Sequence, residues 1–208
     1  MAGRNYSLFA RSYLDYGQDQ ARESCLESIA QRASCAGNAE CVVKSPCHNQ
    51  GFKESLIFDD QQSIFEGTAQ VKLCKKIIRE LFFCHSEDLQ KCPFSELPKL
   101  IGKSYGMSAL YYVLTGLGVV CSDCDNNKAT PKKIQRSAKT FCHKDYDEIK
   151  DDPYATNNCF AGNYIHVLLT AGYKFSRNIN LRVANSLNGF DLSWTLGAML
   201  HNTGILNE

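Results

Sequence analysis

The most telling part of the 208-residue sequence is Cys159-Phe-Ala-Gly-Asn-Tyr-Ile-His-Val-Leu-Leu-Thr-Ala-Gly-Tyr-Lys-Phe175, which precedes Asp191-Leu-Ser-Trp-Thr-Leu-Gly-Ala-Met-Leu200. The first block predicts an amphipathic helix that ends at Gly172, because glycine favours a helix C-terminus. Its apolar residues recur at helical spacing and are Phe160, Tyr164, Val167, Leu168 and Ala171. The second block predicts a short helix with Asp191 as its N-cap, since a carboxylate there accepts hydrogen bonds from free amides.

The remainder of the chain alternates between helical and extended patterns. Apolar residues at helical spacing predict helices over 18–33, 74–82, 104–118 and 130–141. The last of these begins with Thr130-Pro131, a cap followed by a proline in the first turn. Alternating patterns predict strands at 6–14, 55–58, 63–71 and 179–183, with polar loops at 35–51 and 121–129. Interleaved strands and helices without an internal repeat predict one α/β or α+β lobe.

The composition limits the classes of partner and the compartment. Lysine and arginine total 23 and aspartate and glutamate 22, so the formal net charge of +1 gives no electrostatic reason to expect nucleic acid. Eleven cysteines indicate an oxidising compartment with structural disulfides, and the odd number leaves at least one unpaired within this chain. The tripeptide Asn5-Tyr6-Ser7 is a candidate glycosylation site.

Neither a membrane span nor an export signal is recognised in the sequence. The longest mostly apolar run, residues 109–121, is shorter than the ~20 residues that cross a bilayer. The amino terminus Met1-Ala-Gly-Arg-Asn5 is polar. Because a cysteine-rich chain without an export signal is a contradiction, we expect a fragment, a truncated isoform or an incomplete gene model.

Several motifs of known catalytic sites are missing from these residues. The chain has no P-loop, no Gly-x-Ser-x-Gly elbow, no dinucleotide-binding glycine pattern and no His-Glu-x-x-His. An alternative is a zinc site made by Cys121-Ser-Asp-Cys124 with Cys142-His143, although a helical pattern intervenes and the second pair is adjacent rather than spaced. The five histidines form no cluster in the sequence.

Five further segments, in order, support one family resemblance. They are Tyr6-Ser-Leu-Phe-Ala-Arg-Ser-Tyr-Leu-Asp-Tyr-Gly17, Pro46-Cys-His-Asn-Gln-Gly-Phe-Lys53, the helix that begins at Cys74, Gly102-Lys-Ser-Tyr-Gly-Met-Ser-Ala-Leu-Tyr-Tyr112 and Phe141-Cys142 with Tyr146-Asp-Glu-Ile-Lys150. With the Asp-x-x-Trp-x-Leu-Gly block, this order resembles the C-terminal part of the apyrases, the ectonucleoside triphosphate diphosphohydrolases. The resemblance covers nearly the whole chain, and the block at 191–200 is its most specific part.

The resemblance implies a ribonuclease-H-like fold of the actin-like ATPase superfamily, of which this chain would be the second lobe with added helices and disulfides. Residues 1–190 would be the nucleobase-side lobe, and residues 191–208 a C-terminal helix that crosses back to the first lobe. The family removes the terminal phosphate of nucleoside tri- and diphosphates, such as ATP and ADP, with Ca²⁺ or Mg²⁺. Family members act outside the cell or in the lumen of the secretory pathway, and some are anchored by membrane segments that this chain lacks.

In the family, the phosphate-binding loops and the glutamate that serves as general base lie N-terminal to the matched region. A hydrolase without those groups loses its main stabilisation of the transition state. We therefore expect this chain by itself to be inactive and to hold no divalent ion. The alternative is a non-catalytic, truncated apyrase-like module that binds a ligand or a partner.

The resemblance also implies residue roles. Tyr112 matches the position whose ring stacks on the nucleobase, and Ser108, Ala109 and Tyr154 would line the same pocket. Periodicity alone favours a core position for Tyr112, beside other apolar residues, and an ordinary exposed loop position for Tyr154. Asp191 and the single tryptophan, Trp194, would hold the lobes together, although a lone tryptophan is also a common packing anchor.

Three disulfides follow from the same resemblance. They would pair Cys47 with Cys74, Cys84 with Cys92, and Cys142 with Cys159. The family's Leu-Cys-Tyr-Gly is Leu14-Asp-Tyr-Gly17 here, so one further family disulfide is missing. The pairing of the remaining cysteines is left open; these are Cys25, Cys35, Cys41, Cys121 and Cys124.

Overall fold

A computed structural model describes residues 13, 16–33, 41–58, 60–83, 94, 97, 100, 103–122, 124, 127–187, 190–192 and 199. Within this part of the chain the fold is mixed α/β, as the sequence predicts. The five α-helices are α1 (Gln18–Arg32), α2 (Val71–Phe82), α3 (Ala109–Gly116), α4 (Pro131–Cys142) and α5 (Asn158–Val167). The α5 helix continues into a π-helical turn, Leu168–Gly172, so the predicted end at Gly172 is confirmed.

The strands of the described residues form two small sheets and a hairpin. In the first sheet, β1 (Cys41–Ser45) pairs in parallel with β3 (Gln61–Gly67), and β2 (Lys53–Phe58) pairs with β3 in the antiparallel sense. In the second, β6 (Leu181–Val183) lies between β4 (Tyr105–Gly106) and β5 (Lys128–Ala129). The hairpin joins β7 (Ser186–Leu187) to β8 (Phe190–Asp191). The β2 and β3 strands, which overlap the strands predicted at 55–58 and 63–71, pair with each other as a hairpin.

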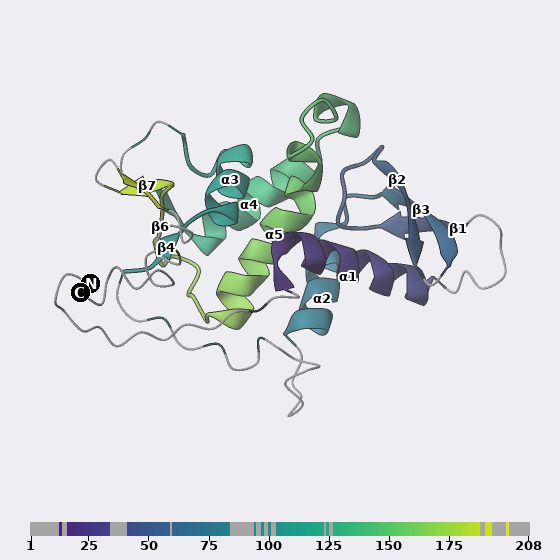
Figure 1. Ribbon diagram of the computed structural model, residues 1–208, viewed down its shortest axis with the longest axis horizontal. Coiled ribbons are helices and arrows are strands. Elements are labelled where there is room, and N and C mark those ends of the chain that lie inside the picture. Colours follow the sequence, from purple (N-terminus) through teal and green to yellow (C-terminus); the bar gives the residue numbers. More distant parts are fainter. Residues whose placement is uncertain are drawn as a thin grey trace.

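The α5 helix lies at the centre of the molecule, with the β1–β3 sheet, α1 and α2 on one side and α3, α4 and the β4–β6 sheet on the other (Figure 1). All ten of its residues are buried. Phe160 and Tyr164 belong to the core cluster shared with α1 and α2, whereas Ala161 and Ile165 belong to the cluster shared with α3 and α4. The prediction that this helix is amphipathic is therefore wrong, because both of its faces pack against other elements.

Three element boundaries differ from the sequence expectation. The predicted loop at 35–51 contains β1, whose side chains alternate between buried and exposed. The predicted helix over 104–118 is shorter, because Tyr105 and Gly106 pair with β6 and Ser108 has a positive φ of 53°. The predicted strand over 63–71 ends at Gly67, where the carbonyl oxygen of Asn49 lies 1.8 Å from the position that a Cβ would occupy.

Asp191 is not a helix cap, which corrects the predicted start of the C-terminal helix. It lies in β8, opposite Ser186 in the hairpin. The sequence between the paired Leu187 and Phe190 is Asn188-Gly189, which strongly favours a two-residue hairpin turn. Of the proposed 191–208 helix the structure also describes Leu192 and a helical position at Met199, whereas Trp194 lies outside the described residues.

Two of the three disulfides implied by the resemblance are present. Cys47–Cys74 joins the loop after β1 to α2, with Cα atoms 4.9 Å apart, and Cys142–Cys159 joins the end of α4 to the start of α5, with Cα atoms 4.8 Å apart. Both cysteines of the proposed Cys84–Cys92 pair lie outside the described residues, as do Cys35 and Asn5. Among the cysteines whose pairing was left open, Cys121 is bonded to Cys124, Cys41 is disulfide-bonded, and Cys25 is a buried free thiol.

Candidate functional site

The predicted nucleobase residues occupy the exposed side of the first turn of α3. Val113 and Leu114 face the core, and Tyr112 therefore points away from it, with 62% of its surface exposed. Ser108, the residue before the helix, and Ala109, its first residue, are also exposed. The amide of Tyr112 donates a hydrogen bond to the Ser108 carbonyl, so the two residues adjoin at the start of α3. The alternative that Tyr112 is a core residue is wrong.

Backbone geometry makes this turn unusual. Ser108 adopts a positive φ of 53°, a conformation that side chains other than glycine rarely take. Its carbonyl accepts a hydrogen bond from the amide of Tyr112 at 3.1 Å, which closes the first helical turn. The rings of Tyr111 and Tyr112 meet edge to face, with centroids 5.4 Å apart. Tyr111 packs partly on the core and so holds the neighbouring exposed ring from one side.

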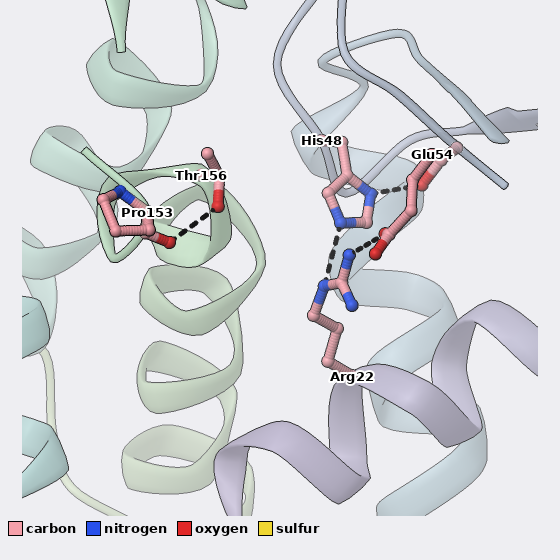
Figure 2. A network of polar contacts seen from close by, with 6 residues as sticks. Arg22, His48, Glu54, Pro153 and Thr156 are labelled. Carbon is pink, nitrogen blue, oxygen red and sulfur yellow. Dashed lines mark hydrogen bonds and ion pairs between the residues drawn. The ribbon is translucent and has the colours of Figure 1, made fainter. Parts of the chain in front are cut away.

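Tyr154 lies in the loop before α5 and has 85% of its surface exposed. The Asp152 carboxylate accepts a hydrogen bond from its amide at 2.9 Å. Figure 2 shows a second contact in the same loop, where the Thr156 hydroxyl donates to the Pro153 carbonyl at 2.9 Å. These bonds order the loop while leaving the tyrosine ring in solvent.

A contact between helices relates the two tyrosines. A Cβ at Gly116, one turn after Tyr112, would lie 2.5 Å from the Asn158 side chain, four residues after Tyr154. The last turn of α3 therefore touches the first turn of α5. Tyr112 lies one helical turn before this contact in α3, and Tyr154 lies in the loop that leads to it in α5. Neither ring lines the cavity between α2 and α4 or the cavity around Gln50 and Asp145.

Sequence reasoning missed a buried polar network that ties α1 to the first sheet (Figure 2). His48 is fully buried. The Arg22 side chain donates to Nε2 of His48 at 3.3 Å and also pairs with the Glu54 carboxylate. Nδ1 of His48 lies 2.7 Å from the Ser45 hydroxyl oxygen. Burial, and then the positive charge of Arg22, lowers the pKa of His48 to about 3.

The hydrogen bonds assign a structural role to this network. Arginine only donates, so Nε2 of His48 must be the acceptor and the neutral ring must carry its proton on Nδ1. That proton is donated to Ser45, so His48 cannot serve as a base toward this hydroxyl. Since both side chains are buried, the group holds elements together and is no nucleophilic site. Arg22, His48 and Glu54 are far apart in the sequence, so no local motif indicates that they form a network.

The cysteines exclude the alternative zinc site. Cys121 is bonded to Cys124 and Cys142 to Cys159, so no thiolate of the proposed ligand set is available. Within the part of the chain that the structure describes, no three His, Cys, Asp or Glu side chains are grouped so as to hold a metal ion. The helices of that part include none that is long and apolar enough to cross a bilayer.

Comparison with known proteins gives a consistent result. Residues 1–207 match the model of the GDA1/CD39 (nucleoside phosphatase) family. The chain is 27% identical over 230 residues to ectonucleoside triphosphate diphosphohydrolase 8 of Rattus norvegicus, covering 98% of this chain and 44% of that protein. It is 28% identical over 224 residues to ectonucleoside triphosphate diphosphohydrolase 1 of Bos taurus, covering 97% of this chain and 43% of that protein.

The chain thus spans less than half the length of these relatives. The matched family model nonetheless extends over almost every residue of the sequence. This chain belongs to the GDA1/CD39 family of nucleoside phosphatases.

Proposed function

We propose that this chain is the nucleobase-binding, C-terminal half of an apyrase-type hydrolase, which removes the terminal phosphate of nucleoside tri- and diphosphates. In this proposal residues 1–190 form the second lobe of a ribonuclease-H-like, actin-like fold, and residues beyond β8 contact the first lobe. The observation that carries the proposal is the exposed ring of Tyr112 at the start of α3.

An exposed tyrosine held at a fixed place suits base recognition. Stacking of a base on an aromatic ring contributes about 1–3 kcal/mol and tolerates different bases, because every base has a π-face. The adjacent Ser108 hydroxyl can donate to or accept from a base edge, and the exposed ring of Tyr154 could cover the other face. This pocket would accept several nucleotides, including ATP and ADP.

The phosphate chemistry would depend on groups that these residues do not supply. The sequence contains none of the glycine-rich turns whose amides cradle phosphates. A bound Ca²⁺ or Mg²⁺ would neutralise phosphate charge in the complete enzyme. We propose that this ion is held by the complete enzyme and not by this chain alone. We therefore propose that the chain alone binds nucleotide without turning it over.

The names of the relatives support a place outside the cytosol. They are called ectonucleoside triphosphate diphosphohydrolases, and the disulfides of this chain suit an oxidising compartment. We propose that the complete protein acts at the extracellular face of a membrane, in the secretory lumen or as a secreted enzyme. The second candidate, a non-catalytic binding module, is favoured by the same lack of phosphate loops.

Equilibrium binding of ATP and adenosine to the oxidised chain tests the base site. The Tyr112→Ala variant should weaken both by about 5- to 150-fold, the equivalent of one stacked base. Phe190→Ala, which removes another exposed ring, from the β7–β8 hairpin, should leave binding unchanged. Wild-type affinity in the Tyr112→Ala variant would remove the residue from the site.

Phosphate release from ATP or ADP with Ca²⁺ or Mg²⁺ tests the catalytic part. Release at background level by the chain, with binding intact, is the expected result. Turnover well above background would contradict the proposed inactivity, whereas absence of both binding and turnover would contradict the nucleobase half itself.

A further inference from the structure

We propose that the groove between α2 and α4 is a second binding site, which takes the phosphoanhydride oxygens of a di- or polyphosphate. The groove has a volume of about 610 Å³ and lies apart from Tyr112, which does not line it. Its charged lining residues are all basic: Lys72 and Lys75 come from α2, and Arg136 and Lys139 from α4, with His143 at the end of that helix. No aspartate or glutamate lines it among the described residues.

Lys75 is the residue that points most clearly to an anion. It lines the groove, yet only 8% of its surface is exposed, and no described residue forms a hydrogen bond or an ion pair with its ammonium group. Its nearest charges are Arg79, Lys139 and Lys72, and burial together with these cations lowers its pKa. Most of the side chain is buried beside other cations and no described carboxylate balances their charge, so a bound anion would relieve the mutual repulsion of these cations.

The start of α2 provides a second kind of donor. Gln70, its N-cap, makes no side-chain capping bond in the described structure, and the first turn carries no acidic residue. The Val71 amide bonds to Ala69 and the Cys74 amide to Gln70. The amides between them, those of Lys72 and Leu73, have no partner within the described residues. Free amides at the positive end of a helix bind phosphate oxygens well.

The shape of the groove favours more than one phosphate group. Cations stand on both walls, two on α2 and two on α4, and the volume exceeds that of a single small ion. Their charge suits a linked pair of phosphates better than a lone carboxylate. Free pyrophosphate and the phosphate tail of a nucleotide share this chemistry, and the experiment below separates them.

The test is calorimetric titration of the oxidised 208-residue chain with pyrophosphate, with ATP and with adenosine, in a low-salt chloride buffer. Lys75→Met removes the charge of this largely buried side chain and keeps its length, so we expect at least tenfold weaker pyrophosphate binding. Lys76→Met is the matched control: it has the same change in charge on the same helix, but its side chain pairs with Glu80 and does not line the groove. Its affinity should stay within twofold of wild type.

Further variants separate this site from the nucleobase site. Tyr112→Ala should leave pyrophosphate binding unchanged and weaken adenosine binding. Lys75→Met should weaken pyrophosphate binding and leave adenosine binding unchanged. ATP carries both a base and phosphates and should lose affinity in both variants. Loss of ATP affinity only in Lys75→Met would contradict base stacking on Tyr112 while supporting the phosphate site.

Absence of pyrophosphate binding would overturn the proposal, as would equal losses in Lys75→Met and Lys76→Met, which would show only diffuse positive charge. Should Lys75→Met fail to fold by circular dichroism, Lys139→Met on the opposite wall gives the same test. This variant alters an exposed side chain and is also expected to weaken pyrophosphate at least tenfold.

Discussion

Acidification should destabilise this protein through two buried histidines. His48 is fully buried within the Arg22–Glu54 network, and His166 of α5 is 7% exposed with a buried Nδ1 that has no hydrogen-bond partner in the described structure. Burial first, and neighbouring cations second, lower the pKa of His48 to about 3 and that of His166 to about 4. Both rings are therefore neutral in the folded protein at pH 5.

The sign and size follow from proton linkage. In the unfolded chain each histidine titrates near its usual pKa of about 6.5, so between that pH and the folded pKa the unfolded state binds more protons. The stabilisation is fully present above pH 6.5 and is lost as the pH falls toward the folded values. From pH 7 to pH 5 each histidine should lower the free energy of unfolding by about 2 kcal/mol, or about 4 kcal/mol together. That is a large share of a typical total of about 5–15 kcal/mol.

Urea unfolding of the oxidised chain at pH 7, 6 and 5, followed by far-ultraviolet circular dichroism, measures this loss. The buffers should be free of phosphate, because His166 lies near Lys75 and Arg79. His48→Gln and His166→Gln should each remove about half of the pH dependence, whatever they do to stability at pH 7. His143→Gln, at an exposed position, is the control. Equal unfolding free energies at pH 7 and pH 5 in the wild type would refute the reasoning.

Three further changes test the framework. Replacing Cys142 and Cys159 by alanine removes the disulfide that links residues 17 positions apart in the sequence. The free energy of unfolding, measured by chemical denaturation, should fall by about 3 kcal/mol. An unchanged value would mean that the bond contributes nothing to stability. Gly67→Ala places a methyl group on the carbonyl of Asn49, so a destabilisation of about 3 kcal/mol or more is expected, and a normal melting temperature would contradict the packing there. Thr130→Ala removes the hydroxyl that accepts from the third amide of α4 at 3.1 Å and should cost about 1 kcal/mol in the same assay.

The parts of the fold that were predictable are those with a local cause. The α2 and α4 helices each lie with one face on the core and one in solvent, so their apolar spacing is visible in the sequence. Thr130-Pro131 marks the start of α4 for a reason that involves only adjacent residues. The two observed disulfides follow from the family pattern, because their positions survive in the order of the motifs.

The errors have a long-range cause. Asn163 and His166 look like the polar face of α5, yet both are buried. The side-chain amide of Asn163 donates to the Cys159 carbonyl at 2.8 Å within the same helix. Because this polar group has a partner inside the protein, it can be buried away from solvent. The β1 strand forms because it pairs with β3, about 20 residues away, and a loop-like local sequence gives no sign of that partner. The Asn188-Gly189 pair is a local turn signal, and a hairpin stands where the Asp-x-x-Trp block predicts the start of a helix.

Periodicity and cap residues were enough to predict most helices, and the resemblance in motif order implied the family and a candidate base-stacking tyrosine on α3. Only the folded arrangement revealed that α5 is enclosed on every side, that His48 is neutral inside a polar network, and that Lys75 is buried among cations. The reason is that spacing along a chain encodes which residues share a face, whereas burial and charge depend on which distant faces meet.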